Sequence, residues 1–265
     1  DRILRGTGSD GYYSRNKLGA IGADLGAVAC FFERPWSRLS PNLSPAGQAW
    51  LLNEAAFSLR ALGRLAEAVE PMRASLEMCI EQEDWKEAAI RASNLSELEL
   101  VRGDVPAAVT AGEQSVALAD RSGDWAQRMT KRTTHADALH QTGRRDEARR
   151  LFEQAESMQA EHQPQYPRLY SLRGFCYCDL LLAPAERAAW QATLRSARVS
   201  GTCSARVSDP AETADRRSPA ASGDLRSAAV ARSETGHNAL QACDAVSERA
   251  AEMLRWDHDN QAWLL

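Results

Sequence analysis

The sequence has 265 residues, 44% of them hydrophobic and 26% charged, and its formal net charge is −4 at pH 7. This composition is typical of a globular chain. Its acidic balance argues against nucleic-acid binding, which usually shows clustered Lys and Arg. The nearest candidate for a membrane span, residues 25–32, is far shorter than the ~18 residues required. Because no secretory leader is visible either, we expect a cytoplasmic protein without membrane contact.

The first predicted element is a helix over residues 12–32, where apolar residues recur at steps of three and four. Three glycines inside it lower helix propensity, and we explain them by close packing against a neighbouring helix: Gly19, Gly22 and Gly26. Two prolines then predict a connector over residues 33–43. Residues 1–43 are therefore interpreted as an N-terminal helix and connector.

From residue 44 onward the sequence repeats with a period of forty residues. Glycines mark the period, and each is followed five residues later by an alanine: Gly63 with Ala68, Gly103 with Ala108, and Gly143 with Ala148. A fixed period of this kind is the signature of stacked repeats. Glycine adopts a left-handed backbone at little cost, so each one is predicted to end the first helix of a pair. The alanine then allows the second helix to approach the first closely.

The predicted helices pair around each glycine. Their bounds are 45–62 with 65–82, 85–102 with 105–122, and 125–142 with 145–163. Ser44, Asp84 and Asp124 stand directly before first helices, where N-cap side chains are expected. The repeats are assigned to 44–83, 84–123 and 124–163, with a fourth at 164–195.

The fourth copy keeps the period, but Ala183 replaces the turn glycine, with Ala188 five residues on. Its first helix is predicted at 168–182. Residues 196–235 contain few apolar side chains and cannot bury enough surface to offset ordering entropy, which predicts a flexible insertion. Residues 236–265 are predicted to hold a C-terminal helix and the start of a further repeat. The missing initiator Met and this unfinished end lead us to expect a fragment of a longer protein.

Over about residues 44–192 the chain resembles the tetratricopeptide repeat (TPR) family, which places small residues inside the first helix and near the end of the second. Those roles fall on Ala56, Ser96, Ala136 and Cys176, and on Ser75, Ser115 and Ala155. The resemblance implies an all-α, right-handed superhelical solenoid of antiparallel helix pairs. The period exceeds the usual 34 residues and is similar to that of kinesin light chains and of sensor arrays on bacterial STAND-class signalling ATPases. The sequence contains no phosphate-binding loop motif of such an ATPase.

The family binds peptides in a concave groove lined by first helices, so the resemblance implies a protein or peptide partner. The groove positions carried over are Asn53, Phe57, Arg60, Asn94, Glu97, Thr133, Asp137, Arg173 and Tyr177. The family's clamp for a C-terminal carboxylate needs Lys and Asn at the positions held here by Asn53, Phe57, Ser93 and Glu97. That clamp is missing, so a chaperone-tail ligand is not expected. We hypothesise a sensing or docking part of a larger signalling protein. The alternative is self-association into a homo-oligomer through exposed solenoid ends.

An enzyme is the other class of function considered. The five histidines form no recognisable catalytic motif with a nucleophile. Cys176 and Cys178 could supply half of a metal site, but no second Cys or His pair has ligand spacing. We therefore predict no catalytic residue, no metal and no cofactor.

Overall fold

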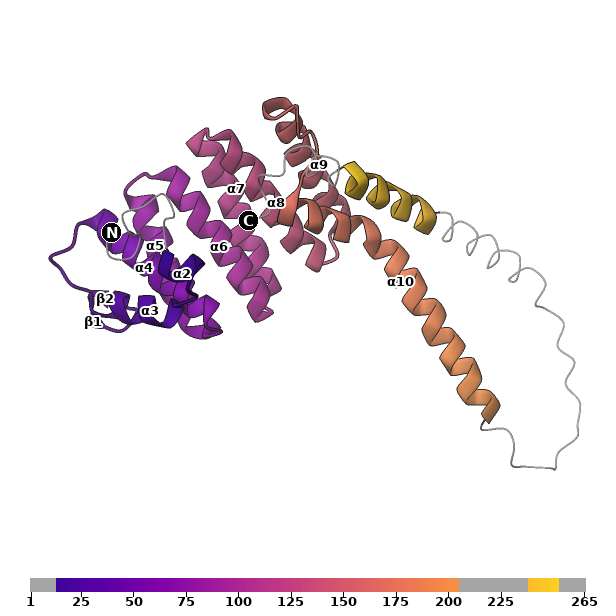
Figure 1. Cartoon of the computed structure of the whole chain (residues 1–265), viewed down its shortest axis with the longest axis horizontal. Coiled ribbons are helices and arrows are strands. Elements are labelled where there is room, and N and C mark those ends of the chain that lie inside the picture. Colours follow the sequence, from indigo (N-terminus) through magenta and orange to yellow (C-terminus); the bar gives the residue numbers. More distant parts are fainter. Residues whose placement is uncertain (1–12, 205–237, 253–265) are drawn as a thin grey trace, which may run out of the picture. The chain divides into compact units, whose positions relative to one another are not determined.

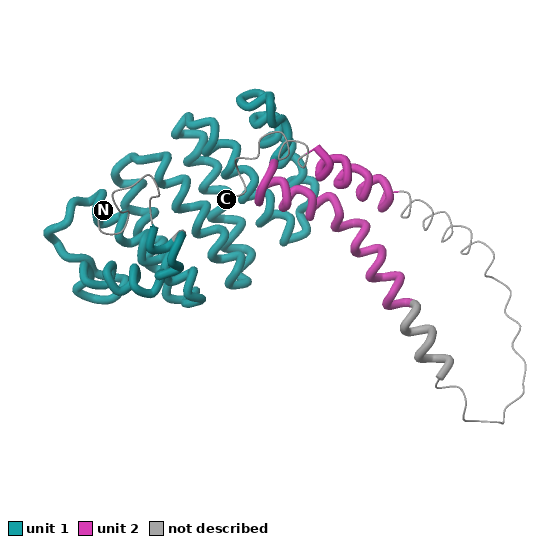
Figure 2. The backbone as a smooth tube through the Cα atoms, in the orientation of Figure 1, with its two compact units in different colours: residues 1–169 teal, residues 170–265 magenta. Residues whose placement is uncertain are grey.

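The computed structural model describes residues 13–204 and 238–252. The described part is dominated by helices (Figure 1), and the chain divides into two compact units, Asp1–Leu169 and Tyr170–Leu265 (Figure 2). The elements are α2 Tyr13–Asn16, α3 Ile21–Ala29, β1 Phe32–Arg34, β2 Arg38–Leu39, α4 Pro45–Ala61, α5 Leu65–Glu81, α6 Trp85–Arg102, α7 Val105–Ser122, α8 Trp125–Gln141, α9 Arg145–His162 and α10 Ser171–Ser204. The all-α repeat fold predicted from the sequence is confirmed.

The single N-terminal helix predicted over residues 12–32 is wrong, because the described part of this stretch holds two helices, α2 and α3. Gly19 lies between them with φ of 62°, a left-handed conformation that stops a helix. A Cβ added at Gly19, Gly22 or Gly26 would meet no atom within 4 Å, so our close-packing explanation for these glycines is wrong too. The predicted connector contains a short antiparallel hairpin, β1–β2, with Phe32 opposite Leu39.

The three helix pairs match the prediction to within one residue at each end. Gly63, Gly103 and Gly143 have φ values of 75°, 83° and 83°, as a left-handed turn requires. The Asp84 carboxylate accepts a hydrogen bond from the Glu87 amide at 3.1 Å, and Asp124 repeats the cap for α8. Local turn and cap chemistry therefore sets the helix boundaries in all three repeats.

Small residues occupy the points where the paired helices cross. Ala68, Ala108 and Ala148 are fully buried. The Ser96 hydroxyl of α6 donates to the Ala108 carbonyl of α7 at 2.7 Å, a contact that brings a side chain of one helix onto the backbone of the other. The Ser75 hydroxyl of α5 donates to the Ala49 carbonyl of α4, also at 2.7 Å. Each helix from α4 to α9 packs on the next, and α6 also packs on α8.

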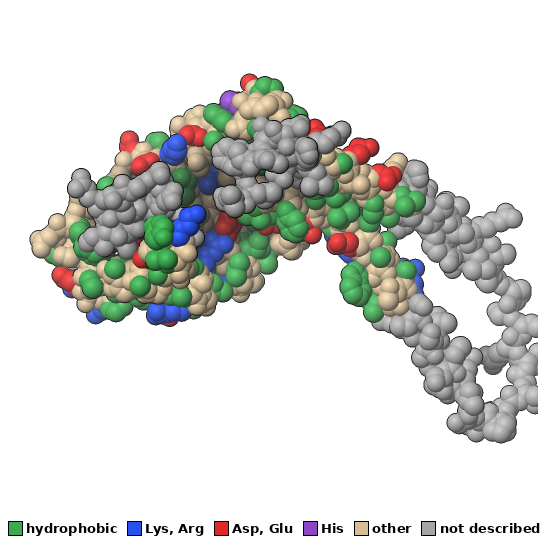
Figure 3. Space-filling model, viewed as in Figure 1, with side chains coloured by type: hydrophobic (Ala, Val, Ile, Leu, Met, Phe, Trp, Pro, Cys, Tyr) green, Lys and Arg blue, Asp and Glu red, His purple; other side chains and the backbone are tan. Residues whose placement is uncertain are grey.

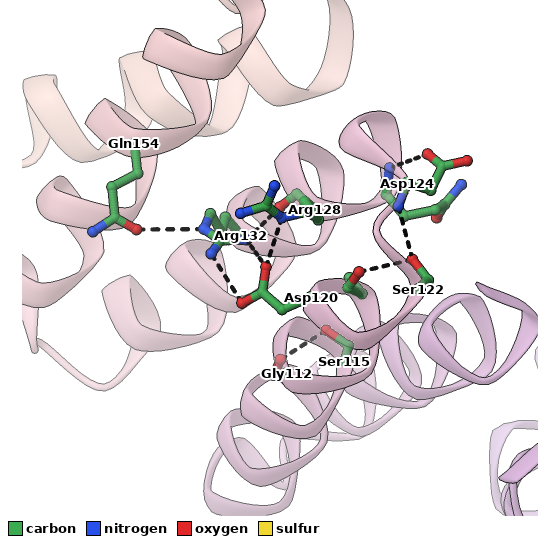
Figure 4. Close-up of polar contacts among 10 residues, drawn as sticks. Gly112, Ser115, Asp120, Ser122, Asp124, Arg128, Arg132 and Gln154 are labelled. Atoms are coloured by element: carbon green, nitrogen blue, oxygen red, sulfur yellow. Dashed lines mark hydrogen bonds and ion pairs between the residues drawn. The ribbon is translucent and has the colours of Figure 1, made fainter. Parts of the chain in front are cut away.

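Polar contacts join the second and third repeats (Figure 4). The Asp120 carboxylate of α7 accepts hydrogen bonds from Arg128 and Arg132 of α8 at 2.9 to 3.0 Å, and Arg132 also reaches Gln154 of α9 at 3.4 Å. Partial burial by itself would raise the pKa of Asp120, but the hydrogen bonds from the two guanidinium groups outweigh it and lower the pKa. The carboxylate is therefore held in its charged form.

The fourth helix pair differs from the prediction. Residues 171–204 form one continuous helix, α10, which runs through Ala183 and Pro184 without a turn. At Ala183 no glycine is present to make a left-handed turn inexpensive. The predicted insertion was expected to begin at residue 196, which lies inside this helix. The rest of that insertion, residues 205–235, falls outside the described residues. Residues 238–252 form a second helix of this unit, and the rest of the predicted C-terminal segment is outside the described part.

Candidate binding surface on the first helices

Six side chains from the first helices α4, α6 and α8 occupy two sets of repeat-equivalent positions. Glu54, Asn94 and Thr134 precede the turn glycine by nine residues, whereas Phe57, Glu97 and Asp137 precede it by six. Side chains three residues apart are neighbours on a helix surface. We call these six residues the first-helix surface. Glu54 is buried, Phe57 is 39% exposed, and the other four are partly exposed.

Three of the predicted groove residues lie in the interior instead. Asn53 is 9% exposed, while Thr133 and Tyr177 are each 4% exposed. The Thr133 hydroxyl donates to the Thr130 carbonyl within its own helix at 2.7 Å. The Asn53 Oδ1 atom is buried and has no hydrogen-bond partner, which is costly for a polar atom.

Two contacts connect successive first helices. Arg60 of α4 and Glu97 of α6, both predicted groove residues, form an ion pair at 3.0 Å. The Ser93 hydroxyl of α6 donates to the Thr134 hydroxyl of α8 at 3.2 Å. The predicted groove residues Arg60 and Glu97 are therefore brought together, and they join repeats one and two.

A side chain from outside the repeats reaches the first-helix surface. Arg15 of α2 forms an ion pair with Glu54 at 3.4 Å, and its guanidinium lies 4.2 Å from the centre of the Phe57 ring. Sequence reasoning missed both Arg15 and Glu54. The forty-residue period could have identified Glu54, because it is the equivalent of Asn94. No sequence signal points to Arg15, since the contact depends on how α2 folds back.

Two of the predicted residues, Arg173 and the buried Tyr177, belong to the second unit. The Arg173 guanidinium lies 5.7 Å from the centre of the Tyr170 ring. Tyr177 of α10 is covered by Arg249, whose guanidinium is 4.4 Å from the ring centre. Arg249 belongs to the helical stretch 238–252, so this stacking packs α10 against that helix.

The chemistry of the described residues is that of a mixed-charge surface. On the face seen in Figure 3, acidic and basic side chains are interspersed over the repeats. In residues 13–204 and 238–252, no group of three or more His, Cys, Asp or Glu side chains could hold a metal ion. A helix long and apolar enough to cross a membrane is likewise absent from the described ranges.

Comparison with known proteins adds the following. No protein-family model matches the sequence, and no curated protein matches it. Among the solved structures similar to it are two of a Podosopora anserina putative kinesin light chain with nearly identical TPR-like repeats, one of them a single-substitution variant. Both are 21% identical and cover 73% of this chain and 92% of their own, with TM-scores of 0.49 for the variant and 0.48 for the other.

The class of protein follows from the helix pairs themselves. Three antiparallel pairs stack in sequence order, each has a left-handed glycine turn, and small buried residues stand where the helices cross. These features define a TPR-like helical repeat protein. Function in such a fold depends on the surface that the stacked helices present.

Proposed function

We propose that the chain is a protein- or peptide-binding repeat scaffold, and that the first-helix surface is where a partner binds. The observation that supports this most directly is the partly exposed polar side chains at repeat-equivalent positions. Asn94 and Glu97 of α6, and Thr134 and Asp137 of α8, are partly exposed at matching positions of successive first helices. Side-chain amides can donate to and accept from a peptide backbone at once.

The finer proposal concerns biological context. We propose a cytoplasmic protein in which the repeats serve as the sensing or docking part of a larger, bacterial-type signalling protein. Solenoids suit this role because stacked repeats create extended surfaces for partners. We further propose that the chain works by binding and has no catalytic activity of its own.

Capture of a partner from an extract of the source organism tests the proposal. The test variant is Asn94→Ala with Glu97→Ala on α6. The matched control is Gln114→Ala with Glu113→Ala, which removes the same two functional groups from exposed positions on α7 of the same repeat. We expect the α6 variant to lose a partner that the wild type and the α7 variant retain. Equal capture by all three proteins would contradict the proposed surface.

The alternative function is self-association, and exposed apolar side chains on α10 favour it. Leu172, Phe175 and Trp190 are 69%, 69% and 68% exposed, and Leu194 is 57% exposed. A second copy of the chain could cover them. Gel filtration with light scattering distinguishes the two functions. A dimer that dissociates in a Trp190→Glu variant supports self-association, whereas a monomer at all concentrations contradicts it.

A further inference from the structure

The interface between repeats two and three holds an imidazole ring with one buried, unsatisfied nitrogen. His135 of α8 faces α7 at Gly112, where an added Cβ would lie 2.8 Å from the His135 Nδ1 atom and 3.2 Å from the Ser96 hydroxyl of α6. The Nδ1 atom is buried without a hydrogen-bond partner. A protonated imidazole must donate from both of its nitrogens. The charged ring would therefore leave a buried N–H group unsatisfied in this interface, which is costly.

We propose that this interface is an acid-sensitive joint that regulates the first-helix surface. When His135 takes up a proton, α7 and α8 separate locally, and α8 loses its fixed position beside α6. This inference deepens the proposed function, on which its last step rests, because it describes the regulation of the same surface. The opening itself requires no partner.

The groups that surround His135 come from every helix packed against α8. Burial lowers the pKa of His135 below its ordinary value of 6.5, while Glu113 of α7 opposes this shift, Arg144 aids it and Glu147 of α9 opposes it. Arg144 donates two hydrogen bonds of 2.7 Å to Glu147, so the opposite charges of this pair partly cancel at the ring. The group near the ring from α6 is the uncharged Ser96 hydroxyl. Burial therefore prevails, and the closed interface favours the neutral imidazole.

Charges on α8 itself act in the same direction. Lys131 and Arg132 stand one helical turn before His135, and their positive charges disfavour a further cation nearby. Arg132 also donates to Asp120 of α7. Partial burial opposes ionisation of Asp120, but the hydrogen bonds from Arg132 and Arg128 outweigh it and lower the pKa of this carboxyl. Because Asp120 stays charged at mildly acidic pH, the first effect of acid on this interface is at His135.

An opening at this interface can remain local. In a stacked-repeat protein each repeat contacts mainly its neighbours, so one interface can open while the others stay closed. In the interface between repeats one and two, the equivalent positions carry Met72 and Leu95, which belong to one buried apolar cluster and bind no proton. Acid therefore weakens one interface and leaves its equivalent unchanged.

The first-helix surface extends across this interface. Asn94 and Glu97 lie on α6, whereas Thr134 and Asp137 lie on α8. The Ser93 hydroxyl of α6 donates to the Thr134 hydroxyl at 3.2 Å, and this bond is lost when α8 moves away. A partner that contacts both helices then loses part of its binding surface. Its binding should therefore weaken as the pH falls below the ordinary pKa of histidine, 6.5.

Hydrogen exchange of the full chain, followed by mass spectrometry between about pH 7 and about pH 5.5, tests the opening. Acid slows the intrinsic exchange of all amides alike, so the protection of α7 and α8 is compared with that of α4 and α5 in the same molecule. We expect this protection ratio to fall at least about threefold over the range, and by no more than about tenfold per pH unit, the limit for one proton. A constant ratio would overturn the inference.

Variants of two histidines assign the effect. His135→Leu introduces the residue found at the equivalent position of repeat two and should abolish the pH dependence of the ratio. His162→Leu is the matched control, since it removes an exposed imidazole from the same repeat, and should retain it. If His135→Leu proves poorly folded by circular dichroism, His135→Gln takes its place, because it keeps a polar side chain that cannot become charged. A pH dependence that persists without His135 contradicts the proposal.

Capture of a partner at the two ends of this pH range tests the regulation. We expect the wild type to release the partner in acid and His135→Leu to retain it. Equal behaviour of the two proteins would overturn the regulatory step, while capture at neutral pH would leave the scaffold proposal intact. Conversely, an opening that depends on His135 supports the acid-sensitive joint even if no partner is captured at either pH and the scaffold proposal is contradicted.

Discussion

The interface between repeats one and two differs from that between repeats two and three at the same repeat positions. Nine residues after the turn glycine, repeat one has Met72 and repeat two has Gly112. The residues at the facing position on the next first helix are Leu95 and His135. Met72 and Leu95 share one buried apolar cluster, whereas a Cβ added at Gly112 would lie 2.8 Å from the Nδ1 atom of His135.

This difference shows that one fold position can be filled in two ways. In the first interface both positions carry apolar side chains of one buried cluster, as in an ordinary core. In the second, the absence of a side chain at Gly112 makes room for the His135 ring, whose Nδ1 atom is buried without a hydrogen-bond partner. The period maintains the backbone arrangement, while the side chains decide how polar each interface is.

The largest expected effect on stability comes from giving the interface between repeats two and three the side chains of the interface between repeats one and two. Gly112→Met places a large side chain where His135 now lies, and overpacking of this kind should lower the free energy of unfolding by about 3 kcal/mol. His135→Leu in the same chain should recover part of the loss, because it removes the ring that lies closest, while the contacts of a Cβ at residue 112 with the Cα atom of residue 135 and with the Ser96 hydroxyl, both at 3.2 Å, remain. Urea unfolding of the two single variants and the double variant measures this coupling, and additive effects would contradict it.

The next effect concerns helix crossing within repeat two. Ala108→Leu adds bulk where the Ser96 hydroxyl contacts the Ala108 carbonyl, and should cost about 1–3 kcal/mol. Ala107→Leu is the matched control, since it is one residue away, only partly buried, and turned by about 100° around the helix. It should cost well under about 1 kcal/mol. Equal urea midpoints for the two variants would show that the crossing point is misplaced.

The second interface should also respond to pH. Burial lowers the pKa of His135 below its ordinary value of 6.5, aided by Arg144 and opposed by Glu113 and Glu147. Below that ordinary value the unfolded chain binds more protons than the folded chain, so stability falls as the pH falls toward the folded-state pKa. The stabilisation from Asp120, Asp124 and Glu147, whose pKa values are also lowered, is lost only in more acidic solution.

The measurement is the urea midpoint of wild type and His135→Leu between about pH 7 and pH 5, a range in which His residues titrate. We expect the wild-type midpoint to fall more steeply with decreasing pH than that of the variant. Parallel profiles for the two proteins would show that His135 is not the source of the pH dependence.

The smallest effect is expected from the ion pair across the first interface. Arg60 and Glu97 are 30% and 39% exposed, so water screens their attraction. A double-mutant cycle with Arg60→Ala and Glu97→Ala should give a coupling energy of about 0.2–1 kcal/mol, decreasing with added salt. A coupling above about 2 kcal/mol would mean that the pair is less screened than its exposure indicates.

Part of the candidate surface could be predicted from the sequence, and part could not. The period identified the first helices as the surface-forming elements, and it placed Phe57, Asn94, Glu97 and Asp137 among the residues that are at least partly exposed. It matches Glu54, not Asn53, to Asn94, but it does not show that Glu54 is buried, because adjacent residues on a helix differ by about 100° in direction and either can face the interior. Only the packing of α4 against its neighbours makes that distinction.

What the sequence determined by itself is local in origin. Gly63, Gly103 and Gly143 end helices because only glycine adopts a left-handed backbone at little cost. Asp84 and Asp124 begin helices because their carboxylates satisfy free amide groups. These effects act within a few residues, so the bounds of six helices, and with them the all-α repeat fold, follow from reading the chain alone.

The tertiary structure alone decided the features that join distant residues. Where the period reaches Ala183 the local rule already fails, because no glycine is present and α10 continues through that position; the contacts that follow have no local cause. His135 fits above Gly112, and Arg15 reaches Glu54 and Phe57. In both cases the partners are more than twenty residues apart in the sequence. No local preference encodes such contacts, since they arise from close packing between elements that meet only in the folded chain.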